Sequence, residues 1–256
     1  MKALRLAFVV LAALSLGACA TTQDTPKDYA HFRAVDPHSI VVVPAVNRSL
    51  EITAADYYLS TITLPLAERG YYVFPVHLVK RVMEDDGLSD ADLVHSAPPE
   101  RLGEMFHADA ILYVSIEKWE STYAVFDTIT QVSIAYALKD AHTGETLWDD
   151  TESLVYQPNA NNSGGGLAGL IAKAIVAAVE RAAPNYMPLA RQANSFAVNR
   201  VGKGLPAGPY SPKYGTDAQM FPSGVQQAKA ETPAPAAAEP PAATPDAAAV
   251  TEKAAN

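Results

Sequence analysis

Ser115 and Lys118 show the Ser-x-x-Lys spacing in which a lysine amine activates a serine hydroxyl for acyl transfer. That reaction needs the two side chains one helical turn apart on a shared face. The surrounding residues 109–119 instead predict a β-strand, on which residues three apart point to opposite faces. The Ser-Asp-Asn and Lys-Thr-Gly motifs that accompany the pair in such enzymes are missing from the sequence. The spacing therefore does not predict an acyl-transfer enzyme.

The glycines of Gly164–Gly169 match the G-x-G-x-x-G pattern of dinucleotide-binding loops. A dinucleotide site needs this loop between a parallel strand and a helix, with an acidic ribose partner about 20 residues later. Here the preceding strand is predicted to belong to an antiparallel meander, and the residues around Tyr186–Leu189 are neutral. We therefore interpret the glycines as a flexible loop that leads into a helix.

The spacing of the histidines and of the acidic residues does not indicate a metal or cofactor site. The histidines lack the i, i+4 spacing of zinc ligands, and Glu84–Asp86 and Asp149–Asp150 lack the alternating oxygens and glycine of a calcium loop. We expect Asp149 and Glu152 to charge a solvated strand edge. We predict no metal, no cofactor, no catalytic residue and hence no enzyme. The histidines, expected at the surface or in caps, are His31, His38, His77, His95, His107 and His142.

Composition narrows the possible partners. The 256 residues include 28 Asp and Glu against 19 Lys and Arg, a formal charge of −9. A nucleic-acid partner requires a basic stripe, which this balance argues against. One Cys excludes a disulfide framework and a cysteine-based zinc site.

Cys19 is the residue to which the sequence assigns a definite chemistry. Lys2 and Arg5 precede an apolar run over residues 6–16, and small residues follow, which predicts a signal peptide over residues 1–18. Eleven helical residues rise only about 16 Å, roughly half the apolar thickness of a bilayer, so the run is no membrane span. Leu16–Cys19 resembles the bacterial lipobox, in which Cys becomes the lipidated first residue. The alternative is a plain signal peptide with an incidental Cys.

The lipobox resemblance implies a diacylglyceryl group on the Cys19 thiol and an acyl chain such as palmitate on the new amino terminus. Several chains together anchor a protein stably, since each buried CH₂ contributes about 0.8 kcal/mol. Ala20, where inner-membrane lipoproteins tend to have Asp, favours the outer membrane and the periplasm-facing side. Removing Lys2 and Arg5 leaves 17 basic and 28 acidic residues, a charge of −11. That charge opposes a second, electrostatic attachment to anionic lipid.

Three segments follow the signal peptide. Residues 19–34 are predicted to be the lipidated N-terminus and a polar tether, and residues 35–215 a single folded domain with a C-terminal extension. Residues 216–256 are predicted to be a disordered tail. Glu231–Asn256 alone holds 11 Ala and 5 Pro without an aromatic residue.

Hydrophobic patterning predicts the elements of the domain. Ser39–Val46 is apolar on both faces, as in a buried strand, and Val132, Ile134, Tyr136 and Leu138 alternate with small or polar residues. Thr53-x-x-Asp56 resembles a capping box, and Gly70 ends the helix that follows. Further strands are expected at Tyr71–Val76, Asp109–Trp119, Ile129–Leu138 and Glu145–Tyr156, and further helices at 77–85, 98–106 and 167–183.

The order β-α-β-α-α-β-β-β-α predicts a single-domain α/β sandwich. Its sheet is mixed, with a C-terminal antiparallel meander followed by a helix. Six tyrosines could line a contact surface, although we favour the alternative that most of them pack within the sheet and helices. They are Tyr57, Tyr58, Tyr71, Tyr72, Tyr113 and Tyr123.

Several motifs together resemble an uncharacterised family of outer-membrane lipoproteins of Gram-negative bacteria. The resemblance spans about residues 37–215 and extends distantly to the periplasmic α/β domains of CsgG, TolB (its N-terminal domain) and LpoB-type synthase activators. One departure is His107, where such domains have Gly. The motifs are Pro44–Ser49, Gly70–Pro75, His107–Tyr113, Asp140–Trp148 and Leu205–Tyr214.

The resemblance implies a non-catalytic envelope component for assembly or secretion that acts through protein contacts. It implies partners among other envelope lipoproteins or copies of itself, beside the membrane that holds its lipid. The alternative is an auxiliary ligand-binding lipoprotein of an ABC-type envelope transport system, with a cleft between the helix at Leu167–Val179 and the sheet.

Overall fold

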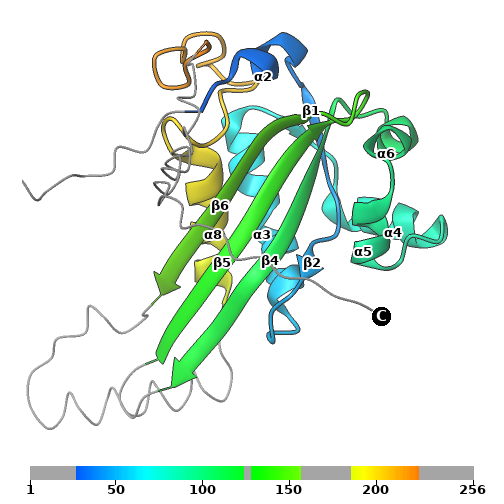
Figure 1. The fold of residues 1–256 in the computed structure, drawn as a ribbon, viewed down its shortest axis with the longest axis vertical. Helices are drawn as coiled ribbons and strands as arrows, with labels where there is room; N and C mark the ends of the chain where they lie inside the picture. Colours follow the sequence, from blue (N-terminus) through cyan, green and yellow to red (C-terminus); the bar gives the residue numbers. More distant parts are fainter. Residues whose placement is uncertain (1–26, 124–127, 157–185, 225–256) are drawn as a thin grey trace, which may run out of the picture. The chain divides into compact units, whose positions relative to one another are not determined.

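A six-stranded mixed sheet organises the computed structural model, which describes residues 27–123, 128–156 and 186–224 (Figure 1). The strand order is β3-β1-β4-β5-β6, with β2 beside β4. β1 pairs in parallel with β3 and β4, while β4, β5 and β6 form the expected antiparallel meander. The strands are β1 (Ser39–Val42), β2 (Val46–Asn47), β3 (Tyr72–Val73), β4 (Ala110–Tyr123), β5 (Thr128–Asp140) and β6 (Thr146–Tyr156).

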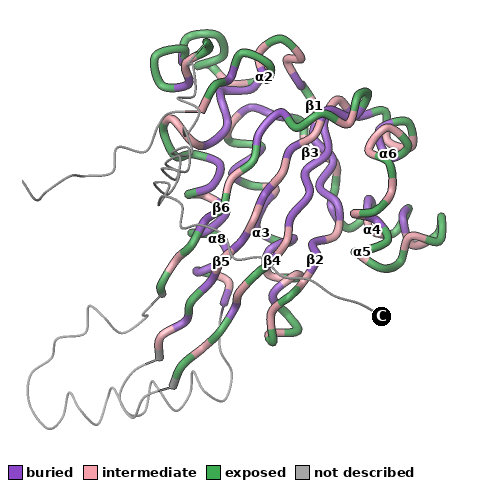
Figure 2. Tube along the Cα trace, in the orientation of Figure 1, coloured by how far each residue is buried: buried purple, intermediate pink, exposed green. Residues whose placement is uncertain are grey.

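Two sets of helices cover the two faces of the sheet. α3 (Ala54–Arg69) and α8 (Met187–Asn199) pack on the face that carries Val42, Leu112 and Leu138. The other face of β1 and β4 packs against three shorter helices (Figure 2). This arrangement confirms the α/β fold with a mixed sheet. The shorter helices are α4 (Val76–Asp85), α5 (Ala91–Ser96) and α6 (Pro99–Phe106).

Alternation along the strands explains the two cores. In β1, Ile40 and Val42 face α3, whereas Val41 faces the core beneath α4–α6. β1 is therefore apolar throughout, as a strand covered on both sides must be. The predicted strand over Ser39–Val46 is divided in two, because β1 ends before Pro44 and pairing with β4 resumes at β2.

α3 begins and ends close to the predicted positions, but its N-terminus is not a capping box. Thr53 has helical backbone angles and makes no side-chain cap, and its hydroxyl donates to Glu51 Oε1 at 2.6 Å. Gly70 ends the helix in the left-handed conformation, with φ of 99°. Gly fits there because it has no Cβ to clash with the backbone.

The folded part extends beyond both predicted boundaries. Residues expected in the tether form α2 (Ala30–Val35), and Tyr29 and Phe32 are buried. Residues expected in the tail contribute Asp217 and Phe221 to the interior. The predicted helix at Leu167–Val179 and the Ala/Pro-rich stretch lie outside the described residues.

α8 was not predicted, and a buried amide holds it in place. Asn194 is completely buried, and its Nδ2 donates to Tyr58 O at 3.2 Å and to Thr61 Oγ1 at 2.9 Å on α3. Its Oδ1 accepts the Tyr136 hydroxyl of β5 at 3.0 Å. One side chain therefore links both helices to the sheet.

Asn194→Ala is expected to destabilise the protein by about 2–4 kcal/mol, because it leaves buried donors and acceptors on three elements without a partner. Ser195→Ala, at a half-buried position next to Asn194 on the same helix, is the control and is expected to cost less than about 0.5 kcal/mol. Urea unfolding measures both. Equal midpoints for the two variants would contradict the proposed linking role.

Candidate functional site

Two of the family-like motifs, distant in sequence, meet at one end of α3. The Gly208 N–H donates to Arg69 O at 2.9 Å, and the Tyr210 N–H donates to Gly70 O at 3.0 Å. A Cβ on Gly208 would collide with the Gly70 carbonyl, so this contact requires glycine. We call this region the motif junction: α2, Arg69–Tyr71 and Leu205–Phe221.

Asp217 is the ionic centre of the motif junction. Its carboxylate is 1% exposed and accepts Arg33 Nη2 at 2.9 Å and the Ala207 N–H at 2.6 Å. Arg69 Nη2 lies 3.8 Å from the other carboxylate oxygen, and its guanidinium stacks 4.8 Å above the Phe221 ring. Burial lowers the pKa of Arg69, against the opposing charge of Asp217. A carboxylate shared by two arginines ties the C-terminal segment to both helices.

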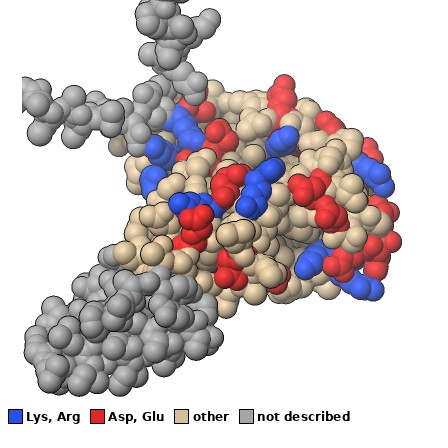
Figure 3. Space-filling view, turned by 60° about the horizontal axis from the view of Figure 1, so that its bottom comes forward, with Lys and Arg blue, Asp and Glu red and all other residues tan. Residues whose placement is uncertain are grey.

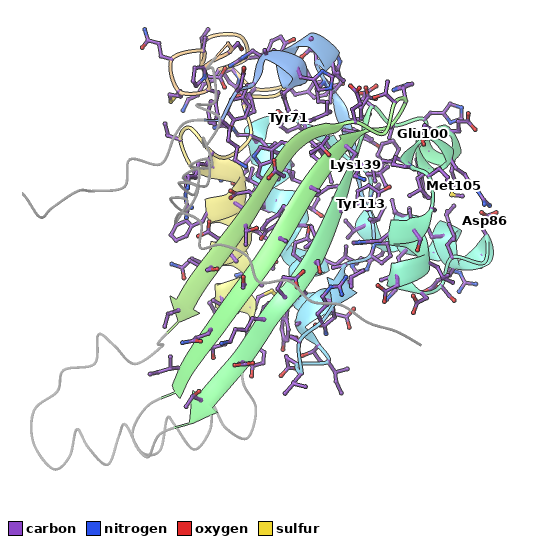
Figure 4. The ribbon with its side chains drawn as sticks, viewed as in Figure 1. Tyr71, Asp86, Glu100, Met105, Tyr113 and Lys139 are labelled. Atoms are coloured by element: carbon purple, nitrogen blue, oxygen red, sulfur yellow. The ribbon has the colours of Figure 1, made fainter. Side chains whose placement is uncertain are left out.

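Two buried tyrosines add neutral hydrogen bonds to the motif junction. The Tyr71 hydroxyl donates to Pro206 O at 2.8 Å, and the Tyr29 hydroxyl donates to Gly204 O at 2.6 Å. Burial raises the pKa of both hydroxyls well above the usual value, so both remain donors throughout the physiological range. Tyr71 is buried and lies in the upper part of the fold in Figure 4.

A small cavity of about 190 Å³ opens beside this cluster, lined by Phe32, Arg33, Tyr71 and Tyr214, among others. The Tyr214 hydroxyl donates to Asp36 Oδ2 at 2.6 Å across its rim. Pockets for drug-sized ligands start at about 300 Å³. The arrangement is suited to holding segments of the chain together, with an outer rim that can make contacts.

Ser115 and Lys118 lie on the same face of β4, so the expectation of opposite faces is wrong. A bulge between Ile116 and Lys118 adds a residue to β4, and Ser115 therefore pairs with Ala135 while Lys118 pairs with Ser133. Arg48 Nε donates to Ser115 Oγ at 3.2 Å, and Lys118 Nζ lies 3.2 Å from Glu120. The hydroxyl and the amine thus have different partners.

The histidines occupy separate places. His95 Nε2 lies 3.0 Å from Pro44 O, and burial lowers the pKa of its ring. His107 ends α6 in the left-handed conformation, with φ of 52°, so the turn survives without Gly. Among the described residues, no three His, Cys, Asp or Glu side chains lie close enough together to hold a metal ion.

Most of the six tyrosines pack inside the protein, as favoured. Tyr58, Tyr71 and Tyr113 are buried, and Tyr57 is half-buried against the same core as Tyr58. Tyr72 is exposed, and the side chain of Tyr123 lies outside the described residues. Lys139 Nζ lies 5.3 Å above the Tyr113 ring (Figure 4). Burial, together with the charge of Glu100, raises the pKa of Tyr113 to about 12.

The two acidic residues expected at a solvated edge of β6 differ in their exposure. Asp149 is exposed, but Glu152 is buried and accepts Arg200 Nη2 at 2.6 Å. Burial raises the Glu152 pKa, and Arg200 opposes that rise. On the face shown in Figure 3, basic and acidic side chains alternate without a broad field of either sign.

A loop at the other end of α3, which sequence reasoning missed, exposes two large apolar side chains. Leu50 and Ile52 are 90% and 89% exposed. Hydrogen bonds order the loop: Asn47 Nδ2 donates to Glu51 O at 2.8 Å, and the Ser49 N–H donates to Asn47 Oδ1 at 3.0 Å. We call Arg48–Thr53 the distal loop. Its Asn-x-Ser turn was visible in the sequence, but the exposure of its apolar residues was not.

Cys19 and Gly164–Gly169 lie outside the described residues. Within the part of the chain that the structure describes, no helix is both long and apolar enough to cross a membrane.

Comparison with known proteins identifies relatives over most of the domain. Residues 27–210 match the family described as "Putative lipoprotein GNA1162-like". The "Putative lipoprotein NMB1124/NMB1162" of Neisseria meningitidis serogroup B is 35% identical over 165 residues, covering 64% of this chain and 76% of the relative.

Two of the solved structures similar to this chain are also lipoproteins or lipoprotein domains. Lipoprotein GNA1162 from Neisseria meningitidis is 34% identical, with a TM-score of 0.47, and covers 57% of this chain and 99% of its own. The LpoB C-terminal domain from Escherichia coli is 18% identical, with a TM-score of 0.34, and covers 46% of this chain and 84% of its own.

Asp217→Asn is expected to destabilise the protein by about 3 kcal/mol, because it leaves two largely buried arginines without their counter-charge. Asp149→Asn removes an exposed carboxylate 3.9 Å from Lys27 and is expected to cost less than about 1 kcal/mol. Chemical denaturation compares the two. A loss for Asp217→Asn no larger than for Asp149→Asn would contradict the ionic role of Asp217.

Gly208→Ala is expected to cost about 2–3 kcal/mol, because the added methyl group meets the Gly70 backbone. Gly215→Ala is the control: Gly215 has φ of 70° but open space around it, so only backbone strain of about 1 kcal/mol applies. Thermal unfolding ranks the two variants. A smaller effect at Gly208 would show that the close approach is not required.

Proposed function

The chain belongs to the GNA1162-like lipoprotein family, and on this premise we propose a lipid-anchored, non-catalytic envelope component that acts through protein contacts. Its lipid would be carried by Cys19, in the outer membrane, with the domain facing the periplasm. Support for the anchor comes from the signal-peptide pattern and from the lipobox-like Leu16–Cys19.

The distal loop is the observation that carries the proposal of protein contacts. Exposing both Leu50 and Ile52 is unfavourable in water, since burying a side chain of this size is worth about 1.5–3 kcal/mol. The loop is nevertheless ordered, so its apolar side chains are presented without a further ordering cost on binding. An exposed apolar pair on a fixed loop fits a recess on a protein partner.

The position of the loop agrees with this role. α3 starts next to the distal loop and ends at the motif junction, and its 16 residues span about 24 Å. The first described residue, Lys27, joins the motif-junction end through its N–H bond to Gly202 O at 3.2 Å. A lipid on Cys19 would therefore hold that end near the membrane and leave the distal loop facing away from it.

Ligand carriage is the second candidate, favoured by one pocket. A space of about 380 Å³ lies between α3, α4 and α8, lined by Tyr57, Leu59, His77, Lys80 and Met187, among others. Its size is within the range of small-molecule sites. The cleft expected beside Leu167–Val179 lies outside the described residues. The pocket between α3, α4 and α8 is therefore a different candidate binding site for the same ligand-carrying role.

Cys19→Ser is expected to move the protein from the membrane fraction to the soluble periplasmic fraction, because the variant has no thiol to receive the diacylglyceryl group. Cell fractionation compares the wild-type protein with the variant, and intact-mass analysis of the wild-type protein detects the lipid adduct. A variant that still sediments with outer membranes would contradict anchoring through Cys19.

The lipidated protein is crosslinked to its partners in cells. Leu50→Asp and Ile52→Asp are each expected to reduce the amount of the crosslinked species by about tenfold, which corresponds to a loss of about 1.4 kcal/mol of binding free energy. Leu78→Asp, at an exposed position on α4, is the matched control and is expected to retain it. Mass spectrometry identifies whether the partner is another protein or a second copy. Wild-type protein that yields only monomer would contradict the contact proposal and favour the ligand carrier.

A further inference from the structure

The end of the domain that receives the tether is formed by both ends of the described chain. The Tyr29 N–H donates to Pro222 O at 3.0 Å, and the Gly224 N–H donates to Asp28 Oδ1 at 2.8 Å. Together with Lys27 and Gly202, these contacts gather residues 27–36 and 200–224 into one surface, which we call the tether end (upper part of Figure 1).

The tether is short. Seven residues, 20–26, separate Cys19 from Lys27, and eight Cα-to-Cα steps reach at most about 29 Å when fully extended. Any less extended path brings the tether end closer to the bilayer. With lipid on Cys19, Lys27 therefore stays within about 29 Å of the lipidated residue.

The tether end exposes the kinds of side chain that suit a membrane interface. Val201 and Tyr210 are 64% and 68% exposed, and Tyr214 and Met220 are also exposed. Tyrosine combines an apolar ring with a polar hydroxyl, and lysine can place its stem on apolar material while its ammonium stays in water. Lys213 lies between the two tyrosines in the sequence and is exposed.

Residues 200–224 are less acidic than the chain as a whole. Residues 200–224 contain Arg200, Lys203 and Lys213 but only one acid, Asp217, which is buried against Arg33. β6 supplies Glu152 to Arg200 and Asp149 and Asp150 to Lys27, and Glu145, just before β6, lies 3.1 Å from His31. The two acidic residues of segment 27–36 accept hydrogen bonds within the domain. Asp28 accepts one from the Gly224 N–H, and Asp36 accepts one from the Tyr214 hydroxyl. Residues 200–224 are therefore net basic, whereas the chain without residues 1–18 has a charge of −11, so the contact depends on the apolar and tyrosine side chains and not on net charge.

We propose that the tether end lies directly on the phospholipid headgroups of the leaflet that holds the lipid, with Val201, Tyr210 and Met220 at the interface. This inference rests on the proposed anchoring at Cys19. The contact restricts rotation of the domain about its tether and holds the distal loop away from the bilayer. It adds a defined orientation to what the lipid alone provides.

Spin labels in the mature, lipidated chain test the contact. Cys19 is the only cysteine and its thiol is consumed by the lipid, so Val201→Cys, Met220→Cys and Leu50→Cys each provide a single labelling site. The labelled chains are placed in vesicles of phosphatidylethanolamine and phosphatidylglycerol. Electron paramagnetic resonance then measures collisions of each label with oxygen, which concentrates in lipid, and with a water-soluble nickel complex.

The expected result is a ratio of oxygen to nickel collisions at least threefold higher at positions 201 and 220 than at position 50. Equal ratios at the three positions in chains that float with the vesicles would overturn the membrane contact and leave the anchor intact. Wild-type chains that carry no lipid and do not float would instead overturn the anchor itself. Flotation and label accessibility therefore separate the two proposals.

Discussion

The close approach of Gly70 and Gly208 determines how the chain closes on itself. Because neither glycine has a side chain, the C-terminal segment can run against the end of α3 and exchange backbone hydrogen bonds with it. That approach brings Asp217 to Arg33 and Arg69, which lie on or beside two different helices. Without it, the Asp217 carboxylate would lose its two counter-charges, and residues 205–221 would depend on side-chain contacts such as the hydrogen bond from Tyr71 to Pro206.

The sheet is the rigid framework against which α3 and α8 pack. Long antiparallel pairing from β4 to β6 provides a platform, and the bulge after Ile116 keeps both Ile116 and Trp119 in the core beneath α3 and α8. The bulge explains why strict alternation failed as a guide to Ser115 and Lys118. A period of two predicts the facing of residues only while the ladder remains regular.

Local sequence patterns therefore predicted helices and strands such as α3 and β5, but not the long-range contacts between them. Strand β5 and helix α3 follow from alternation, apolar periodicity and Gly70, all of which lie in adjacent residues. The inward-facing Asn194, and the burial of Tyr29 and Phe221, depend on partners more than a hundred residues away. α8 itself has small and polar residues among its buried positions, so its hydrophobic pattern is weak. Both domain boundaries were placed too far inward because aromatic residues in polar stretches pack against each other across the fold.

Three of the five family-like motifs lie at the two ends of α3, whereas His107–Tyr113 and Asp140–Trp148 lie on the α6–β4 and β5–β6 connections. Pro44–Ser49 provides the hydrogen bonds of the distal loop, whereas Gly70–Pro75 and Leu205–Tyr214 meet at the motif junction. A helix of about 24 Å keeps the two regions apart. Motifs devoted to one catalytic centre would be expected to converge on a single pocket. Motifs that shape opposite ends instead fit a protein that is held at one end and makes contacts at the other.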